Sequence, residues 1–289
     1  MTVFNGRDAI TSFLDECDTW LSESVTLYVL GGSAMTVQGL KEQTEDIDLA
    51  LSVASEFEHV HRILTSRGFT VVDEPTASFG GVGTTVELQH DGRGLQIDLF
   101  ERQIVGKVWM TDRMHDRAAE FWAGNHATAF VPADEDMFLL KAVSGGELAS
   151  GRQRDIEDMR TYAQRGLDYE VILTEIDEQR PFNTGSTEAH QIRDRSHPLF
   201  TIEIGVNALS GLPNAFTARI REFATEFETE YTVLGAVDDG IYNVDPIRER
   251  VLANVRALSN DQEAAVDDAI GRMVEKQIVE RDGKTVRPR

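Results

Sequence analysis

The stretch Thr44-Glu45-Asp46-Ile47-Asp48-Leu49 decides which fold this chain is expected to adopt. Apolar residues alternate with Asp46 and Asp48, which is the period-two pattern of a half-buried strand and puts both carboxylates on one face. Neighbouring carboxylates repel each other unless a proton or a cation lies between them. Hard divalent cations such as Mg²⁺ or Mn²⁺ take oxygen ligands of this kind, together with phosphates and water. The stretch therefore predicts a metal-binding strand, with an exposed strand edge as the alternative.

A glycine turn lies upstream of this strand. Residues 24–30 are rich in β-branched and aromatic side chains and predict a strand that ends at Gly31-Gly32-Ser33, followed by a helix over 34–40. Two glycines at such a turn let a phosphate approach the backbone, while the Ser33 hydroxyl and the amides at the helix start supply donors. The motif therefore predicts a phosphate-binding turn, and a plain tight turn is the alternative.

A third carboxylate follows about fifty residues after the pair. Two alternating runs, Thr85–His90 and Leu95–Phe100, flank the turn sequence Asp91-Gly92 and predict a β-hairpin. A glycine-rich loop over 75–83 precedes it. Asp98 has apolar neighbours on both sides, so it lies on the polar face of its strand. The third acidic residue of a two-metal site would occupy such a position, whereas an ordinary surface residue is the alternative.

In this order the three pieces resemble the polymerase-β-type nucleotidyltransferase superfamily, whose pattern is a glycine-serine turn, an Asp-x-Asp strand and a later single Asp. The spelling of residues 31–49 is most similar to stand-alone members from abortive-infection and toxin–antitoxin systems and to their uncharacterised bacterial and archaeal relatives. The resemblance covers roughly residues 24–158. It implies an α+β fold, in which a mixed nucleotidyltransferase sheet is flanked by helices and followed by a helical domain.

The resemblance also implies a reaction: transfer of a nucleoside monophosphate from a nucleoside triphosphate to an acceptor, with release of pyrophosphate. Asp46 and Asp48 would hold two Mg²⁺ or Mn²⁺ ions, and Asp98 would complete one ion's shell and accept a proton. The phosphates would lie against Gly31, Gly32 and the Ser33 hydroxyl. The resemblance favours RNA, such as the end of a tRNA, as the acceptor. A protein hydroxyl or a small molecule stays open, and an antitoxin is a conceivable protein partner.

A second set of candidate residues lies on two helices predicted over 132–143 and 152–165. These candidates are Lys141, Arg152, Arg154, Asp155 and Asp158. By the same resemblance the lysine would touch the triphosphate, either arginine would contact the nucleotide or the acceptor, and either aspartate would steady this clamp. A solvated charged helix face with local ion pairs is the alternative.

The charge of the chain is strongly acidic. Its 28 Lys and Arg residues face 50 Asp and Glu residues, which gives a net charge of −22, and lysine occurs only at positions 41, 107, 141, 276 and 284. This balance resembles the surface of proteins from salt-loving archaea, where concentrated potassium screens the self-repulsion. An acidic protein of an ordinary cytoplasm is the alternative. The charge disfavours non-specific binding to phosphate backbones but leaves room for a local basic groove.

Cysteine content and hydropathy bound the location. Cys17 is the single cysteine, so an intramolecular disulfide and a cysteine-based zinc cluster are excluded. No apolar run approaches the length of a membrane span, and the first residues lack the apolar core of a signal peptide. We therefore expect a soluble cytoplasmic protein without a membrane partner.

The chain is expected to form three domains: a catalytic domain over 1–130, a helical domain with the clamp over 131–200, and a C-terminal helical domain over 201–289. The last is compatible with a winged helix, because helices precede a hairpin that turns at Asp282-Gly283. Its recognition-helix segment, 262–276, is acidic, which disfavours DNA. The rival function is therefore a non-catalytic regulator that keeps the fold and binds DNA or protein through this domain.

Four local expectations complete the prediction. Residues 7–23 should form one amphipathic helix, and residues 202–206 a short strand. His59 and His61 should be surface residues, and Trp122 should belong to the core.

Overall fold

The computed structural model describes residues 3–73, 85–104, 108–146, 153–179, 198–255 and 262–289. The chain divides into two compact units, Met1–Lys141 with Thr161–Leu167 and Ala142–Arg160 with Asp168–Arg289. The predicted division into three functional domains stays a prediction, and the glycine-rich loop over 75–83 lies outside the described residues. No helix in the described ranges is long and apolar enough to cross a bilayer.

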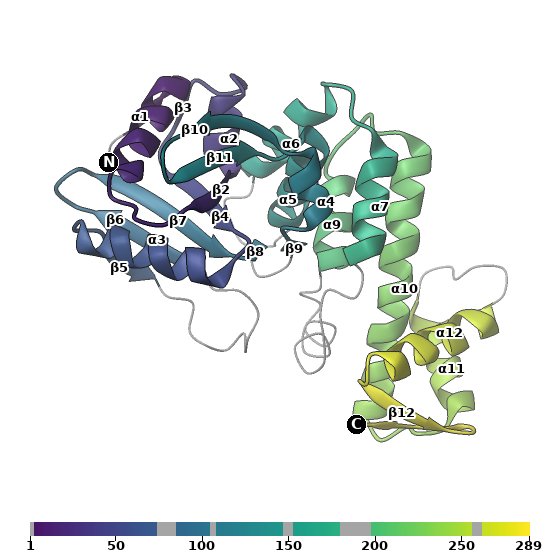
Figure 1. Cartoon of the computed structure of the whole chain (residues 1–289). Coiled ribbons are helices and arrows are strands. Elements are labelled where there is room, and N and C mark those ends of the chain that lie inside the picture. Colours follow the sequence, from purple (N-terminus) through teal and green to yellow (C-terminus); the bar gives the residue numbers. More distant parts are fainter. Residues whose placement is uncertain (1–2, 74–84, 105–107, 147–152, 180–197, 256–261) are drawn as a thin grey trace. The chain divides into compact units, whose positions relative to one another are not determined.

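The first unit is built on a seven-stranded mixed sheet with the strand order β10-β11-β2-β4-β7-β6-β5 (Figure 1). Its strands are β2 (Val25–Val29), β4 (Ile47–Leu51), β5 (Thr70–Asp73), β6 (Thr85–His90), β7 (Leu95–Glu101), β10 (Ala119–Ala123) and β11 (Ala127–Val131). Strands β4 and β7 run parallel at the centre, whereas β2 and β6 run antiparallel to them on either side. The predicted aspartate strand and hairpin are therefore confirmed, and the fold is α+β as expected.

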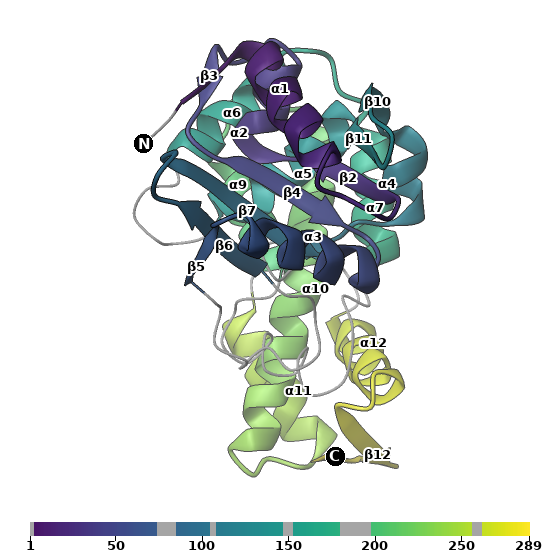
Figure 2. The same cartoon turned by 60° about the vertical axis from the view of Figure 1, so that its left-hand side comes forward.

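Short elements and helices complete this unit. They are α1 (Gly6–Asp18), α2 (Gly31–Val37), α3 (Ala54–Ser66), α4 (Asp112–Arg117), α5 (Asp134–Gly145, shared with the second unit), and the strand pairs β1 (Phe4–Asn5) with β3 (Gln43–Thr44) and β8 (Gln103–Ile104) with β9 (Val108–Trp109). Helix α3 packs along β4 and β7 (Figure 2). Its buried side chains include Phe57, Val60 and Leu64. The alternating residues Ile97 and Leu99 of β7 are fully buried. Their burial leaves the polar residues of these strands on the opposite face.

Helix α1 is shorter than predicted, because it ends at Asp18 rather than at residue 23. The buried Asp18 carboxylate accepts hydrogen bonds from the backbone N–H groups of Asn125, His126 and Ala127 at 2.8, 2.7 and 2.9 Å. A Cβ at Gly124 would lie 2.5 Å from the Asp18 carboxyl carbon. The aspartate therefore ties the end of α1 to the turn between β10 and β11.

Strands β10 and β11 were not predicted, although both contain residues that favour strands: Phe and Trp in Ala-Glu-Phe-Trp-Ala, and Thr, Phe and Val in Ala-Thr-Ala-Phe-Val. In the structure β11 lies parallel to β2, and β10 pairs with β11 across a bulge. Trp122 of β10 is only half-buried and donates its Nε1–H to Asp15 Oδ1 at 2.9 Å. The prediction that it belongs to the core is therefore wrong.

Two further local predictions are wrong. His59 is 3% exposed, and its Nδ1 lies 2.9 Å from an Arg62 guanidinium nitrogen, whereas His61 is half-buried. Residues 202–206 lie within helix α9 (Pro198–Asn207) instead of a strand. The buried Leu199, Ile202 and Val206 are three and four residues apart, so the same short pattern also fits a helix, and tertiary packing decided between the two.

The second unit is helical. It contains part of α6 (Gln153–Ala163), and then α7 (Tyr169–Gln179), α9, α10 (Asn214–Asp238), α11 (Val244–Asn254) and α12 (Gln262–Glu275), followed by strands β12 (Val279–Asp282) and β13 (Thr285–Pro288). The 25-residue helix α10 packs against α7, α9, α11 and α12. It is the element on which the other helices of this unit assemble.

The C-terminal segment has the order and the pairings of a winged helix. A bridge between Asn243 and Thr285 adds the residues before α11 to the β12–β13 hairpin. Two backbone hydrogen bonds fix it: the N–H of Val244 donates to the Lys284 carbonyl at 2.8 Å, and that of Val286 to the Tyr242 carbonyl at 2.7 Å. The segment has its helices and hairpin in the predicted order, and its assignment as a winged helix stays a prediction.

A buried carboxylate fastens α12 to α10. Glu230 of α10 is fully buried, and its oxygens lie 2.6 Å from Arg272 Nε and 3.6 Å from Lys276 Nζ. Both basic side chains at the C-terminal end of α12 are thus directed at α10. The exposed positions of α12 include Asp268 and Glu275.

The first testable prediction concerns Asp18. Burial alone would raise the pKa of this carboxyl, but the three backbone donors bring the pKa below its usual value. Its stabilisation is therefore present above the unfolded-state pKa and is lost as the pH falls through the folded-state value. Asp18→Asn would place a side-chain NH₂ group against these three backbone N–H groups. It should lower the free energy of unfolding by roughly 1–3 kcal/mol at pH 7. Urea denaturation should show a smaller difference near pH 3. Asp91→Asn, in the exposed turn of the β6–β7 hairpin, should change little.

Candidate metal and nucleotide site

The parallel register of β4 and β7 puts two of the predicted carboxylates side by side. Asp48 of β4 is the register partner of Asp98 of β7, and the flanking pairs are Ile47 with Ile97 and Leu49 with Leu99. Neighbouring strands lie about 4.8 Å apart, so the two aspartates face each other across one strand spacing. Apolar burial on the opposite face holds this register, because a slip of one residue would turn every apolar side chain outward.

Asp46 joins them from the residue before β4. Its Oδ1 accepts a hydrogen bond from Thr44 Oγ1 at 3.1 Å, and its charge acts directly on Asp98. The three carboxylates that the sequence singled out are therefore neighbours in the structure, although they are not grouped as a preformed metal site.

The glycine turn packs directly against this cluster. A Cβ on Gly31 would lie 1.8 Å from Asp48 Oδ2, and Gly31 has a φ of +57°. A Cβ on Gly32 would lie 2.8 Å from Thr44 Oγ1. Both glycines are thus required by close approach, and Gly31 also by its backbone conformation. Helix α2 begins at Gly31, three residues earlier than predicted.

Ser33 has a structural role that sequence reasoning did not assign to it. Its side chain is fully buried, its hydroxyl donates to the Leu30 carbonyl at 2.7 Å, and the same oxygen accepts the N–H of Asp48 at 3.3 Å. The hydroxyl therefore links the start of α2 to the aspartate strand. A direct phosphate contact by this hydroxyl stays a prediction.

The other end of α2 is anchored by Gln38, which caps the helix. Its Nε2 donates to Asp134 Oδ1 at 3.1 Å, and its Oε1 accepts from the Tyr162 hydroxyl at 3.0 Å. Arg165 forms an ion pair with the same Asp134. Helix α2 is thereby held at both ends, so the glycine turn is fixed against Asp48.

Burial and neighbouring charges disfavour the ionised form of Asp98. Its Oδ1 is buried and has no hydrogen-bond partner within the described residues. Burial, followed by the charges of Asp46 and Glu87, raises the pKa of Asp98 to about 6, and a hydrogen bond from Gln96 offsets part of the effect. A buried acceptor without a partner is costly, so this oxygen is suited to receive a cation or a proton.

Glu87 is a carboxylate that sequence reasoning missed. It lies on β6 directly opposite Asp98. The alternation in the run Thr85–His90 already puts it on the polar strand face. The two predicted runs leave four residues between them, which already places Glu87 opposite Asp98. The observed loop has four residues, closed by hydrogen bonds from the Arg93 and Gly94 N–H groups to the His90 carbonyl.

The donor set suits a hard divalent cation in its chemistry. Asp46, Asp98 and Glu87 have no Lys or Arg partner among the residues that the structure describes, and Asp98 Oδ1 is left without a donor. In that same part of the chain, no three His, Cys, Asp or Glu side chains are already grouped as a metal site. Cation binding would therefore have to draw the carboxylates together.

The second set of candidates is divided between the units. Lys141 is a half-buried residue of the first unit, and Arg154 is an exposed residue of the second. Asp155 and Asp158 are buried at 9% and 4% exposure, so this part of α6 is not a uniformly solvated charged face. Arg152 lies outside the described residues. The clamp stays a prediction.

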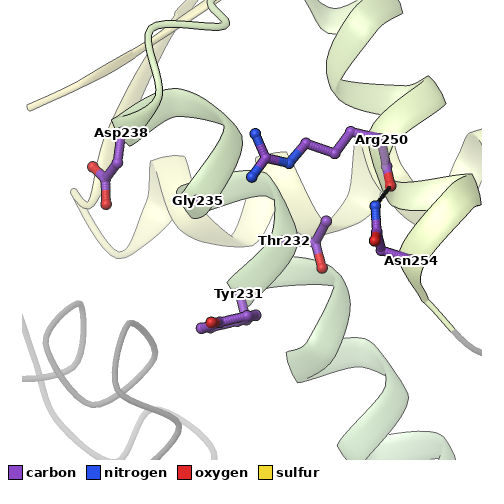
Figure 3. Close-up of a pocket in the computed structure, with 6 residues that line it drawn as sticks. All are labelled: Tyr231, Thr232, Gly235, Asp238, Arg250 and Asn254. Carbon is purple, nitrogen blue, oxygen red and sulfur yellow. Dashed lines mark hydrogen bonds between the residues drawn. The ribbon is translucent and has the colours of Figure 1, made fainter.

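The second unit contains a separate hollow of about 310 Å³ between α10 and α11 (Figure 3). It is lined by Tyr231, Thr232, Gly235, Asp238, Arg250 and Asn254. The Asn254 side-chain amide donates to the Arg250 carbonyl at 2.7 Å, and the Arg250 guanidinium pairs with Asp239 at the same distance. The arginine is thus already neutralised, and the hollow shows no arrangement that selects a ligand.

Comparison with known proteins gives little beyond this. No family model matches the sequence, and no curated protein matches it. Among solved structures, a provisionally assigned nucleotidyltransferase from Thermotoga maritima, TM1012, is 18% identical, covers 55% of this chain and 96% of its own, and has a TM-score of 0.35. JHP933 from Helicobacter pylori is 11% identical, covers 77% and 96%, and has a TM-score of 0.31. Scores this low do not decide a fold, so the α+β assignment rests on the strand order and register.

The second prediction tests the close approach of Gly31. Gly31→Ala introduces a positive-φ penalty of about 1–2 kcal/mol and a clash with the Asp48 carboxylate. The free energy of unfolding should fall by at least about 2 kcal/mol, or soluble yield should be lost. Gly39→Ala is the matched control, since Gly39 has a φ of +73° with nothing within 4 Å of the added Cβ. Equal losses for the two variants would contradict the assigned contact.

The third prediction tests the charge on Asp98. A raised folded-state pKa means that the stabilisation is complete below the unfolded-state pKa, near 3.8, and is lost as the pH rises through about 6. In the presence of a chelator, Asp98→Asn should therefore be more stable than the unaltered protein by roughly 1–3 kcal/mol at pH 8. The two should converge near pH 4. Urea denaturation across this pH range measures the difference, and parallel stability curves would exclude a strained Asp98.

Proposed function

We propose that this protein is a metal-dependent nucleotidyltransferase that transfers a nucleoside monophosphate from a nucleoside triphosphate to an acceptor. The observation that carries the proposal is the register of β4 and β7, which puts Asp48 beside Asp98 with Asp46 next to them. The glycine turn lies against the same carboxylates. A protein without catalysis has no evident reason to keep mutually repelling aspartates against a turn that exposes backbone to a ligand.

Asp46, Asp48 and Asp98 would hold the Mg²⁺ or Mn²⁺ ions. When bound, such ions lower the pKa of an attacking hydroxyl and neutralise the leaving pyrophosphate. The chain's own residues set the geometry. Gly31 leaves room for the Asp48 carboxylate, and the Ser33 hydroxyl holds the Asp48 backbone. By the resemblance of the motif, Asp98 would complete the shell of one ion and accept the proton of the attacking hydroxyl.

The finer assignments rest on the resemblance of the sequence motifs. We propose RNA, such as the end of a tRNA, as the favoured acceptor, with Lys141 on the triphosphate and Arg152 or Arg154 on the nucleotide or acceptor. A role in a toxin–antitoxin pair, a cytoplasmic location and a halophilic source belong to the same proposal. The charge of −22 and the scarcity of lysine support the last of these.

A second candidate is a non-catalytic regulator that binds through the C-terminal winged helix. The completed wing, with its bridge from Asn243 to Thr285, favours a binding module. A protein partner fits it better than DNA. Arg272 of α12 and Lys276 just after this helix are directed at the buried Glu230, and the exposed positions of the helix include carboxylates. DNA binding by the unaltered protein at physiological salt, without nucleotide, would favour the regulator.

The fourth prediction is label transfer. The protein is incubated with each α-phosphate-labelled nucleoside triphosphate, Mg²⁺, total RNA and total protein, at multimolar and at physiological KCl. We expect label on RNA with one preferred nucleotide. Asp46→Asn and Asp48→Asn should each reduce the rate at least about a hundredfold, because metal stabilisation of the developing charge is worth several kcal/mol.

Asp91→Asn is the control for this assay, since it removes one aspartate charge from an exposed turn of the same unit. Its activity should equal that of the unaltered protein. Absence of transfer with every nucleotide and both acceptor mixtures, in protein shown by circular dichroism to be folded, would overturn the proposed activity and favour the regulator.

A further inference from the structure

The sheet lines up carboxylates on three adjacent strands rather than two. Asp48 of β4 is the register partner of Asp98 of β7, and Asp98 is in turn the partner of Glu87 of β6. Directly opposed side chains on neighbouring strands have their Cβ atoms about 4.5–5.5 Å apart. The three carboxylates therefore form one row across the sheet, with Asp98 in the middle.

Nothing in the described part of the chain neutralises the Asp98–Glu87 end of this row. The Asp98 carboxylate has a buried oxygen without a partner and one hydrogen bond from Gln96, and no ion pair joins Glu87 to a Lys or Arg there. Like charges directly opposite each other destabilise a sheet. Glu87 is half-buried, so water screens its repulsion of Asp98 only in part.

The longer side chain of Glu87 gives it a reach that an aspartate at that position would lack. Its carboxylate is one methylene further from the backbone, so it can bend toward the oxygen of Asp98 that has no partner. The apolar neighbours Val86 and Leu88 are buried on the other face, which keeps Glu87 on the face of the aspartates.

We propose that Glu87 is a further ligand of the divalent cation, which it shares with Asp98. The proposal rests on the function proposed above and adds to it a residue that the three-aspartate motif does not contain. A cation between the two carboxylates gives the buried Asp98 oxygen its missing partner and removes the opposed like charges. Glu87 would then determine how tightly the Asp98 end of the site holds its ion.

The test is the affinity for Mn²⁺, measured by electron paramagnetic resonance and by the rise in melting temperature on Mn²⁺ addition, alone and with ATP. The titrations are made in about 2 M KCl, where the Debye length is under about 3 Å and charges without direct contact are screened. Glu87→Gln should weaken Mn²⁺ binding about tenfold, and it should raise the melting temperature of the metal-free protein because a repelling charge is removed.

Two variants separate ligation from a general charge effect. Glu87→Asp keeps the charge and shortens the side chain, so a ligand role predicts binding at least threefold weaker than in the unaltered protein. Glu101→Gln removes the same charge from the opposite face of β7 and should change the affinity less than twofold. Wild-type affinity in Glu87→Asp and Glu87→Gln, with affinity lost in Asp48→Asn, would overturn the role of Glu87 alone. Absence of Mn²⁺ binding in the unaltered protein would overturn both this role and the proposed metal-dependent activity.

Discussion

The parallel pairing of β4 with β7 is the constraint on which the candidate site depends. It places Asp48 opposite Asp98, a juxtaposition that is unfavourable by itself because like charges repel at one strand spacing. The apolar side chains on the other face of the two strands, buried under α3, hold the register against this repulsion. The packing of the opposite face thus maintains two directly opposed carboxylates that repel each other.

Helix α2 packs against this strand pair and forms a second side of the candidate site. The backbone of Gly31 occupies the space beside Asp48 where a side chain would clash, and the Ser33 hydroxyl connects the helix start to the Asp48 backbone. Gln38 fixes the opposite end of the helix through Asp134 and Tyr162. The residues that a motif search would assign to a ligand therefore act in part by packing.

In the C-terminal segment, two basic side chains point inward at a buried carboxylate. The buried Glu230 draws Arg272 and Lys276 inward, so the cations of α12 stabilise the attachment to α10 instead of facing a nucleic acid. A buried carboxylate between two cations is strongly destabilised when either partner is lost. The same acidic composition that gives the whole chain its charge of −22 also leaves exposed carboxylates on this helix.

The sequence by itself determined the elements whose signals are local: the aspartate strand, the glycine turn, the hairpin around Asp91-Gly92 and the helices of the tail. Period-two and turn chemistry are properties of neighbouring residues, so they can be read without the fold. Only the tertiary structure decided what depends on distant partners. The pairing of β11 with β2 joins segments that are far apart in the sequence, and residues 202–206 are helical because of their packing. The pairing of Asp48 with Asp98 likewise joins distant strands, whereas the position of Glu87 opposite Asp98 already follows from the four residues that separate the runs Thr85–His90 and Leu95–Phe100.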